Sequence, residues 1–120
     1  MPNEYKLIVA GGRDFDDYKL LSKSIWSFAN ATDDEISIIS GMAKGADSMA
    51  AYWARENNVM LYEYPANWNG LGKKAGFIRN TEMGKAADGA LIFWDGKSRG
   101  TEHMIKFMEQ LKKPVIIVNY

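Results

Sequence analysis

Short apolar runs alternate with longer segments of helical periodicity along the whole chain, and this alternation constrains the fold more than any other feature. The apolar runs are "YKLIVAGG" (Tyr5 to Gly12), "EISIIS" (Glu35 to Ser40), "VMLYEYPA", "GALIFWDG" and "PVIIVNY", which begins at Pro114. Each has the length of a strand, and its near-continuous apolar character is typical of a strand buried on both faces.

Four segments with helical patterns separate these runs. The first, "DDYKLLSKSIWSFANA", places Tyr18, Leu21, Ile25 and Phe28 at helical spacing. The others are Gly45 to Asn57, about Lys74 to Ala86, and "SRGTEHMIKFMEQLKK". Repeated strand–helix units predict right-handed crossovers and a parallel sheet. We therefore predict an α/β fold, a single Rossmann-like three-layer domain over residues 1–120 with a five-stranded parallel sheet flanked by about four helices.

Composition excludes several functions. The chain has 15 Lys+Arg and 15 Asp+Glu, so it lacks the overall positive charge on which non-specific nucleic-acid binding depends, and nucleic acid is not the expected partner. It has no cysteine and one histidine, His103, so no disulfide, Cys-ligated zinc or His-rich metal site is expected. We also expect no cofactor and no other metal. Because the apolar run near the N-terminus is too short to span a bilayer, we expect a cytoplasmic protein with no membrane partner.

In parallel α/β sheets, ligands bind beyond the carboxyl ends of the strands. Four loops follow the first four predicted strands, and each combines small and polar residues. These loops are "AGGRDF", "SGMAKGAD", "PANWNGLGKK" and "WDGKSRGT". We expect them to converge on one edge and to form a ligand site there.

The first loop contains Gly11 and Gly12, which allow a tight turn or the close approach of a ligand. Arg13 could pair with a phosphate or carboxylate, or could form a surface pair with Asp14. Asp14 could also cap the following helix or hold a ribose hydroxyl.

The second loop ends at the start of a predicted helix, whose N–H groups and dipole favour an anion. Ser40, Gly41 and Gly45 would form the phosphate cradle, and Lys44 would add charge. Asp47 could belong to the site or act as a capping residue. The spacing matches neither a Walker A loop nor a dinucleotide fingerprint.

The third loop offers Asn67 and Trp68, and Trp68 could stack on a base or pack as a lid over the sheet edge. Lys74 and Arg79 lie roughly 140° apart on a helix, so both cannot face one ligand, and Arg79 with Asn80 is the stronger candidate.

In the fourth loop, Ser98, Gly100 and Thr101 place small residues at a helix N-terminus, and Asp95 is an available carboxylate. His103 has no partner in sequence and can be an ordinary helix residue.

Five segments together resemble the SLOG superfamily, which joins the DNA-processing Smf/DprA proteins to the Lonely Guy phosphoribohydrolases, and in particular its YspA-like branch. The segments are "GGRDF", "SGMAKGAD", "PANW", "KKAGFIRNTEM" and "ADGALIFWDGKSRGTEHMI". The resemblance implies a Rossmann-like fold that binds nucleotides or nucleotide-derived molecules at the strand ends. It places Arg79 at the catalytic arginine of the phosphoribohydrolases and Gly100 and Thr101 at their phosphate-binding Gly-Thr.

The resemblance breaks at the catalytic glutamate, whose position falls near Met104. A carboxylate is the usual group that stabilises an oxocarbenium-like centre and activates water, and methionine can do neither. Enzymatic activity therefore stays open, with Asp14, Asp95 and Arg79 as candidate catalytic residues, and Asp47 also within possible reach.

The preferred hypothesis is a protein that binds a nucleotide or nucleotide-derived small molecule, such as an ADP-ribose-type signal, as a sensor or a sequestering protein. The alternatives are a phosphoribohydrolase-like hydrolase of an N-glycosidic or phosphoester bond and, second, a single-stranded DNA-binding protein. We also expect a homo-oligomer, a dimer or larger, because Trp26, Trp53, Phe107 and Met108 offer more apolar surface than one small sheet needs; the same residues could simply fill the core.

Overall fold

The computed structural model describes residues 3–120, apart from the side chain of Lys73. Its strands are β1 (Glu4–Gly11), β2 (Glu35–Ser40), β3 (Leu61–Glu63), β4 (Gly89–Trp94) and β5 (Val115–Asn119). Its α-helices are α1 (Tyr18–Ala31), α2 (Ala46–Glu56), α3 (Trp68–Leu71), α4 (Ala75–Ala86) and α5 (Arg99–Gln110), and a short 3-10 helix covers Gly72–Lys74. The predicted Rossmann-like α/β fold is confirmed.

All strand pairs are parallel, and the strand order is β3-β2-β1-β4-β5. The chain therefore steps outward from β1 to β3, and then returns across the sheet to place β4 on the other side of β1. The strand order reverses between β1 and β4, and such a reversal opens a crevice at the carboxyl edge of a parallel sheet.

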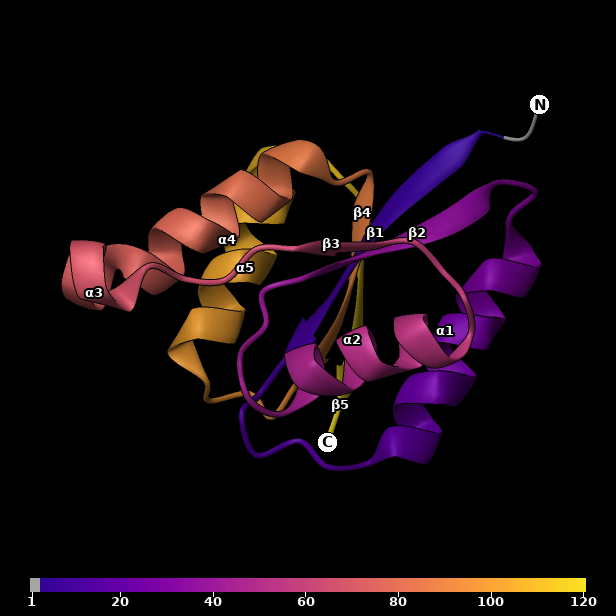
Figure 1. Cartoon of the computed structure of the whole chain (residues 1–120), viewed down its shortest axis with the longest axis horizontal. Helices are drawn as coiled ribbons and strands as arrows, with labels where there is room; N and C mark the ends of the chain where they lie inside the picture. Colours follow the sequence, from indigo (N-terminus) through magenta and orange to yellow (C-terminus); the bar gives the residue numbers. More distant parts are fainter. Residues whose placement is uncertain (1–2) are drawn as a thin grey trace.

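Helices cover both faces of the sheet (Figure 1): α1 and α2 lie on one side, and α4 and α5 on the other. Strand β1 shows why the strands read as continuous apolar runs, since Leu7 and Val9 pack beneath α1 and α2 while Ile8 and Ala10 pack beneath α4 and α5. Burial on both faces removes the polar alternation of a half-exposed strand.

Two segments differ from the sequence expectation. The third strand has only three residues, Leu61–Glu63, and lies at the edge of the sheet, where it pairs only with β2. The segment predicted as a polar loop contains α3 and the 3-10 helix; Asn67 begins α3 and accepts a hydrogen bond from the Gly70 N–H at 3.0 Å. Within residues 3–120, no helix combines the length and apolar character that crossing a membrane requires.

The four residues behind the expected oligomer have different surroundings. Trp53 and Met108 are fully buried in the two halves of the core, Phe107 is partly buried, and Trp26 is exposed. The core therefore accounts for much of this apolar surface, and the oligomer stays a prediction.

Candidate functional site

A pocket of about 170 Å³ lies at the carboxyl edge of the sheet, beside the strand-order reversal. Residues from β1, α3, α4, the first turn of α2, the N-terminal half of α5 and the loops after β1 and β2 surround it. They are Ala10, Gly11, Arg13, Ala43, Asp47, Trp68, Gly76, Phe77, Arg79, Asn80, Ser98, Gly100, Thr101 and Met104. All four predicted loops or the helices directly after them contribute to this one pocket.

Arg79 is held in a fixed orientation on the pocket wall. Its Nη1 donates to the carbonyl oxygen of Gly41, and its Nε donates to Asn80 Oδ1 at 3.0 Å. Asn80 is in turn anchored, because its Nδ2 donates to the Gly100 carbonyl at 3.1 Å and lies 3.3 Å from His103 Nδ1. Burial lowers the pKa of Arg79, and the charge of Asp47 offsets part of this effect. Because the ordinary pKa of arginine lies above about 12, Arg79 stays cationic at neutral pH.

Arg13 brings a second cation to the same pocket from the loop after β1. Its guanidinium lies over the Trp68 ring, 5.8 Å from the ring centroid. The two ion pairs among the described side chains are Arg55–Glu63 and Lys106–Glu102, so Arg13 has no carboxylate partner in that set. An exposed arginine on an aromatic face can donate several hydrogen bonds to an anion.

Asp47 is a buried carboxyl in the first turn of α2, with 5% of its surface exposed. The pKa of Asp47 is raised from 3.8 to about 6, with burial as the largest cause. The nearby Arg79 charge, the backbone N–H groups of Ala43 and Gly11, and the Arg13 charge lower the pKa and offset part of that effect. A carboxyl with this pKa is mostly ionised at neutral pH and becomes neutral under mild acid.

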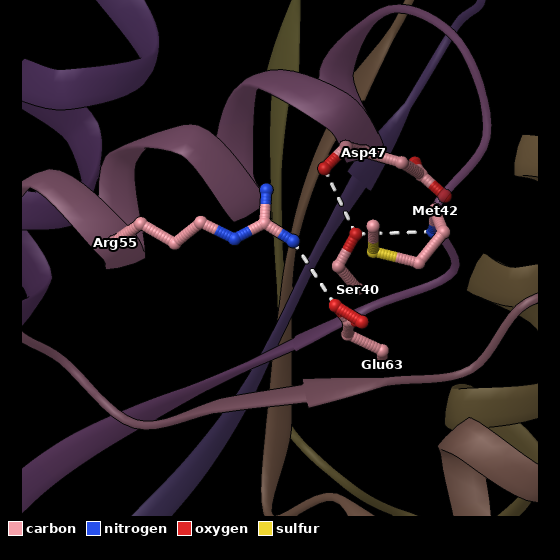
Figure 2. Close-up of polar contacts among 5 residues, drawn as sticks. All are labelled: Ser40, Met42, Asp47, Arg55 and Glu63. Carbon is pink, nitrogen blue, oxygen red and sulfur yellow. Dashed lines mark hydrogen bonds and ion pairs between the residues drawn. The ribbon is translucent and has the colours of Figure 1, made fainter.

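Ser40 holds the loop between β2 and α2 in place through hydrogen bonds and does not leave space for a ligand (Figure 2). The Ser40 hydroxyl donates to the Asp47 carbonyl oxygen at 2.8 Å and accepts from the Met42 N–H at 3.1 Å. Further along α2, the Arg55–Glu63 ion pair, at 3.0 Å, ties the helix to β3. Ser40 is fully buried and does not line the pocket.

The glycines of this loop make room for protein groups. A Cβ on Gly41 would lie 2.7 Å from Asp47 Oδ2 and 2.8 Å from Arg79 Nη1. Gly45 has a φ of +87°, and its Cα faces the Gly12 carbonyl and the Arg13 backbone. The Ala46 N–H at the start of α2 donates to the Gly12 carbonyl at 3.3 Å. The N-terminus of α2 is therefore largely occupied by the protein itself.

The N-terminus of α5 is more open. Ser98 begins the helix, and its hydroxyl accepts from the Thr101 N–H at 3.5 Å. The carboxylate of Asp95 accepts from the N–H groups of Ser98 and Lys97, which lowers its pKa, and this carboxylate orders the turn outside the pocket. A Cβ on Gly100 would meet no atom within 4 Å, so the first turn of a 12-residue helix faces open space, an arrangement that suits an anion.

The structure brings together nine of the predicted site residues. These are Gly11, Arg13, Asp47, Trp68, Arg79, Asn80, Ser98, Gly100 and Thr101. Gly41 and Lys44 line an adjoining hollow, which shares Arg13, Trp68 and Arg79 with the pocket.

The remaining predicted residues lie elsewhere. Gly12, Ser40 and Gly45 shape the loops, and Asn67 caps α3. Lys74 is exposed at the start of α4 and does not line the pocket. Asp14 accepts a hydrogen bond from the Tyr120 hydroxyl at 2.6 Å and also lies outside the pocket; Asp17, not Asp14, caps α1.

Sequence reasoning missed Phe77 and Gly76. Phe77 is 48% exposed and lines the pocket, while Trp68 packs over Gly76. Both residues lie three or four positions from Arg79 or Asn80, so helical spacing from those two could have identified them. Met104 lines the pocket with 1% of its surface exposed, so the position to which the resemblance assigns the phosphoribohydrolase glutamate is an apolar part of the wall here.

Fold and pocket together define a small Rossmann-like α/β domain with a basic, aromatic-rimmed pocket at the carboxyl edge of its sheet. The chain belongs to the YspA, cpYpsA-related SLOG family, whose model matches residues 5–70. That match spans the loops after β1 and β2, and the walls supplied by α4 and α5 lie beyond it.

A curated relative and a solved structure extend the comparison. The chain is 32% identical over 117 residues to the Gene 61 protein of Mycobacterium phage D29, and the match covers 92% of this chain and 94% of that protein. DNA processing protein A (DprA) from Streptococcus pneumoniae has a similar fold, with a TM-score of 0.72 and 20% identity. That match covers 96% of this chain, which spans 50% of the DprA chain.

Within residues 3–120, no three His, Asp or Glu side chains come together as a metal site requires. The groups that the pocket offers a ligand are two guanidiniums, one carboxyl, one amide, two hydroxyls and two aromatic rings. This set suits a compound with both anionic and aromatic parts.

Proposed function

We propose that this protein binds a nucleotide or a nucleotide-derived small molecule in the pocket at the carboxyl edge of its sheet, as a sensor or a sequestering protein. One observation carries the proposal: Arg13, Arg79 and the open N-terminus of α5 surround the same pocket. Two guanidinium groups, of which Arg79 is held by hydrogen bonds, and a helix N-terminus suit an anion such as phosphate.

The rim supports a nucleotide in preference to a bare phosphate. Trp68 and Phe77 are both 48% exposed and both line the pocket. An exposed aromatic ring stacks on any base with little requirement for hydrogen bonding. A phosphate held by the arginines and a base on this rim would together explain why charged and aromatic groups share one pocket.

Hydrolysis of such a ligand is the second candidate, and Asp47 is the observation that favours it. Of the candidate carboxylates Asp14, Asp47 and Asp95, only Asp47 lines the pocket. A carboxyl with a pKa of about 6 can exchange a proton near neutral pH, as general acid–base chemistry requires. Binding remains the first proposal because Met104 occupies the wall where the phosphoribohydrolases carry their glutamate.

Mass spectrometry distinguishes the two candidates. The purified protein is incubated with AMP, ADP-ribose, NAD and cyclic ADP-ribose isomers, and the protein-bound and free fractions are analysed separately. An intact nucleotide on the protein supports the sensor or sequestering role, whereas a released base or ribose phosphate establishes a hydrolase. A protein that neither retains nor cleaves any of them contradicts both candidates.

Calorimetric titration of variants then tests the pocket itself. Arg13→Gln removes a charged donor worth about 1.5–3 kcal/mol, so affinity for the retained nucleotide should fall roughly 10- to 150-fold. Arg55→Gln is the matched control, because Arg55 is an exposed arginine on the far end of α2 whose ion pair with Glu63 contributes little. Equal losses in both variants would show that overall charge, not the pocket, governs binding.

Single-stranded DNA binding is the remaining alternative, and the fold shared with DNA processing protein A is its support. Binding of an oligonucleotide that weakens steeply as salt rises would favour it, because each phosphate contact releases a counterion. With Lys+Arg and Asp+Glu balanced at 15 each, we expect no such binding at physiological salt.

A further inference from the structure

We propose that Asp47 is a specificity-determining residue that accepts hydrogen bonds from the ribose hydroxyls of the ligand, so that the pocket selects ribosyl phosphates over their deoxy counterparts. The inference rests on the proposed function, since it assigns the sugar part of the nucleotide to a particular side chain. It names the ligand class more narrowly: a phosphorylated compound with free hydroxyls on its sugar.

The position of Asp47 is the first argument. The residue lines the pocket from the first turn of α2, and it is the only carboxylate among the described residues that line it. Arg79 approaches from α4 and Arg13 from the loop after β1, and these are the charged groups that face it. The part of α5 that lines the pocket brings only Ser98, Gly100, Thr101 and Met104, none of which is charged.

The charge of Asp47 is the second argument. A carboxylate beside two arginines weakens the attraction of the pocket for a phosphate, so an anion-binding role alone gives no reason for its presence. A carboxylate is an acceptor that suits hydroxyl donors, with which it forms short, charge-assisted hydrogen bonds. The sugar is the part of a nucleotide that carries such donors.

The free capacity of the carboxylate is the third argument. Two oxygens offer about four acceptor positions, and the backbone N–H groups of Ala43 and Gly11 are the protein donors that lower the pKa of Asp47. Neither Arg13 nor Arg79 forms an ion pair with it among the described side chains. Acceptor positions therefore remain for two hydroxyls of a bound sugar.

The experiment compares AMP with 2′,3′-dideoxy-AMP by calorimetric titration at pH 7.5. The two probes share phosphate and base, so their affinity ratio isolates the hydroxyls. For the wild-type chain we expect AMP to bind at least about tenfold more tightly. Asp47→Asn keeps an acceptor but loses the charge that strengthens these hydrogen bonds, so it should clearly lower the ratio, while 2′,3′-dideoxy-AMP binds the variant as well as or better than it binds the wild type. Asp33→Asn, an exposed change at the opposite end of β2, should leave the ratio unchanged.

A pH series on the wild type gives a second readout that needs no variant. Because the pKa of Asp47 is about 6, its charge is lost between pH 7.5 and pH 5, and the AMP preference should shrink over that range. The phosphate also titrates there, but it does so in both probes, so the ratio cancels its effect.

The outcomes separate this inference from the proposed function. If Asp47→Asn weakens both probes equally, or keeps the full AMP preference, Asp47 only braces its loop; the inference is then wrong while nucleotide binding stands. A wild-type preference that does not change with pH also contradicts the inference. If the wild type binds neither probe nor any other member of the nucleotide panel, both the proposed function and the inference are wrong.

Discussion

Replacing Asp47 with asparagine should change the free energy of unfolding, relative to the wild type, increasingly in the variant's favour as the pH rises. Folding raises the pKa of Asp47 from 3.8 to about 6, mainly by burial. The folded state therefore binds its proton more tightly than the unfolded state, so this residue contributes stability below pH 4 that is lost as the pH rises through 6. The difference between a pKa of 3.8 and one of about 6 corresponds to about 3 kcal/mol.

Urea unfolding of the wild type and Asp47→Asn at a series of pH values measures this effect. Proton linkage predicts that the free energy of unfolding of Asp47→Asn rises by about 2 kcal/mol relative to that of the wild type between pH 4.5 and pH 7.5. With a urea slope of about 1–2 kcal/mol/M, the midpoints should separate by about 1 M or more over that range. Contributions from other titrating groups cancel between the two proteins, and lost packing or hydrogen bonds add only a constant offset.

The test is how the difference in unfolding free energy between the two proteins changes with pH, not the size of that difference at any one pH. A difference that stays constant from pH 4.5 to pH 7.5 would refute the argument, because it would mean that Asp47 titrates alike in both states. A difference that changes in the opposite direction would show that Arg79 and Arg13 outweigh burial. Asp33→Asn, at an exposed turn, should track the wild type throughout.

Three further changes probe the rim and the packing of α4. Trp68→Ala should weaken nucleotide binding by about 1–3 kcal/mol while Trp68→Phe keeps most of it, as titration would show, because a stacking platform needs only an aromatic face. Gly84→Ala should lower the free energy of unfolding by about 1–2 kcal/mol in urea, since the new Cβ would lie 2.6 Å from the Phe107 ring and overpacking exceeds the gain in helix propensity. Lys113→Met should cost about 1 kcal/mol in the same assay, because the ammonium donates to the last carbonyls of α4 at 2.8 Å and 3.1 Å.

The sheet could be predicted because the feature that identifies its strands lies within short stretches of the sequence. Strands buried on both faces need continuous apolar runs, and such runs are visible in the sequence. The bounds of strand β3 and the presence of helix α3 could not be predicted in this way. An edge strand of three residues and a helix of four residues have too few positions to show any periodicity. Asn67 was expected to contact the ligand because its capping role becomes visible only once α3 is known.

The site could be predicted at the level of loops but not of side chains. Parallel strands force the four loops to one edge, so the pocket follows from topology. Whether a loop residue faces the pocket depends on partners far away in sequence, which no local pattern contains. Ser40 turns inward to the Asp47 carbonyl, and Asp14 turns away to the hydroxyl of Tyr120, 106 positions later.

The loop between β2 and α2 lies at the pocket, as expected from the sequence, but its glycines have a different structural role from the one expected. Its glycines suggested a backbone cradle for phosphate, yet the space at Gly41 holds Asp47 Oδ2 and Arg79 Nη1, and the start of α2 is taken by the Gly12 carbonyl. The small residues thus let charged side chains from other elements approach the loop. The charge on this wall of the pocket comes from those side chains, and the pKa of one of them, Asp47, is about 6. A pocket built in this way can change its affinity with pH, which a cradle of backbone N–H groups cannot do.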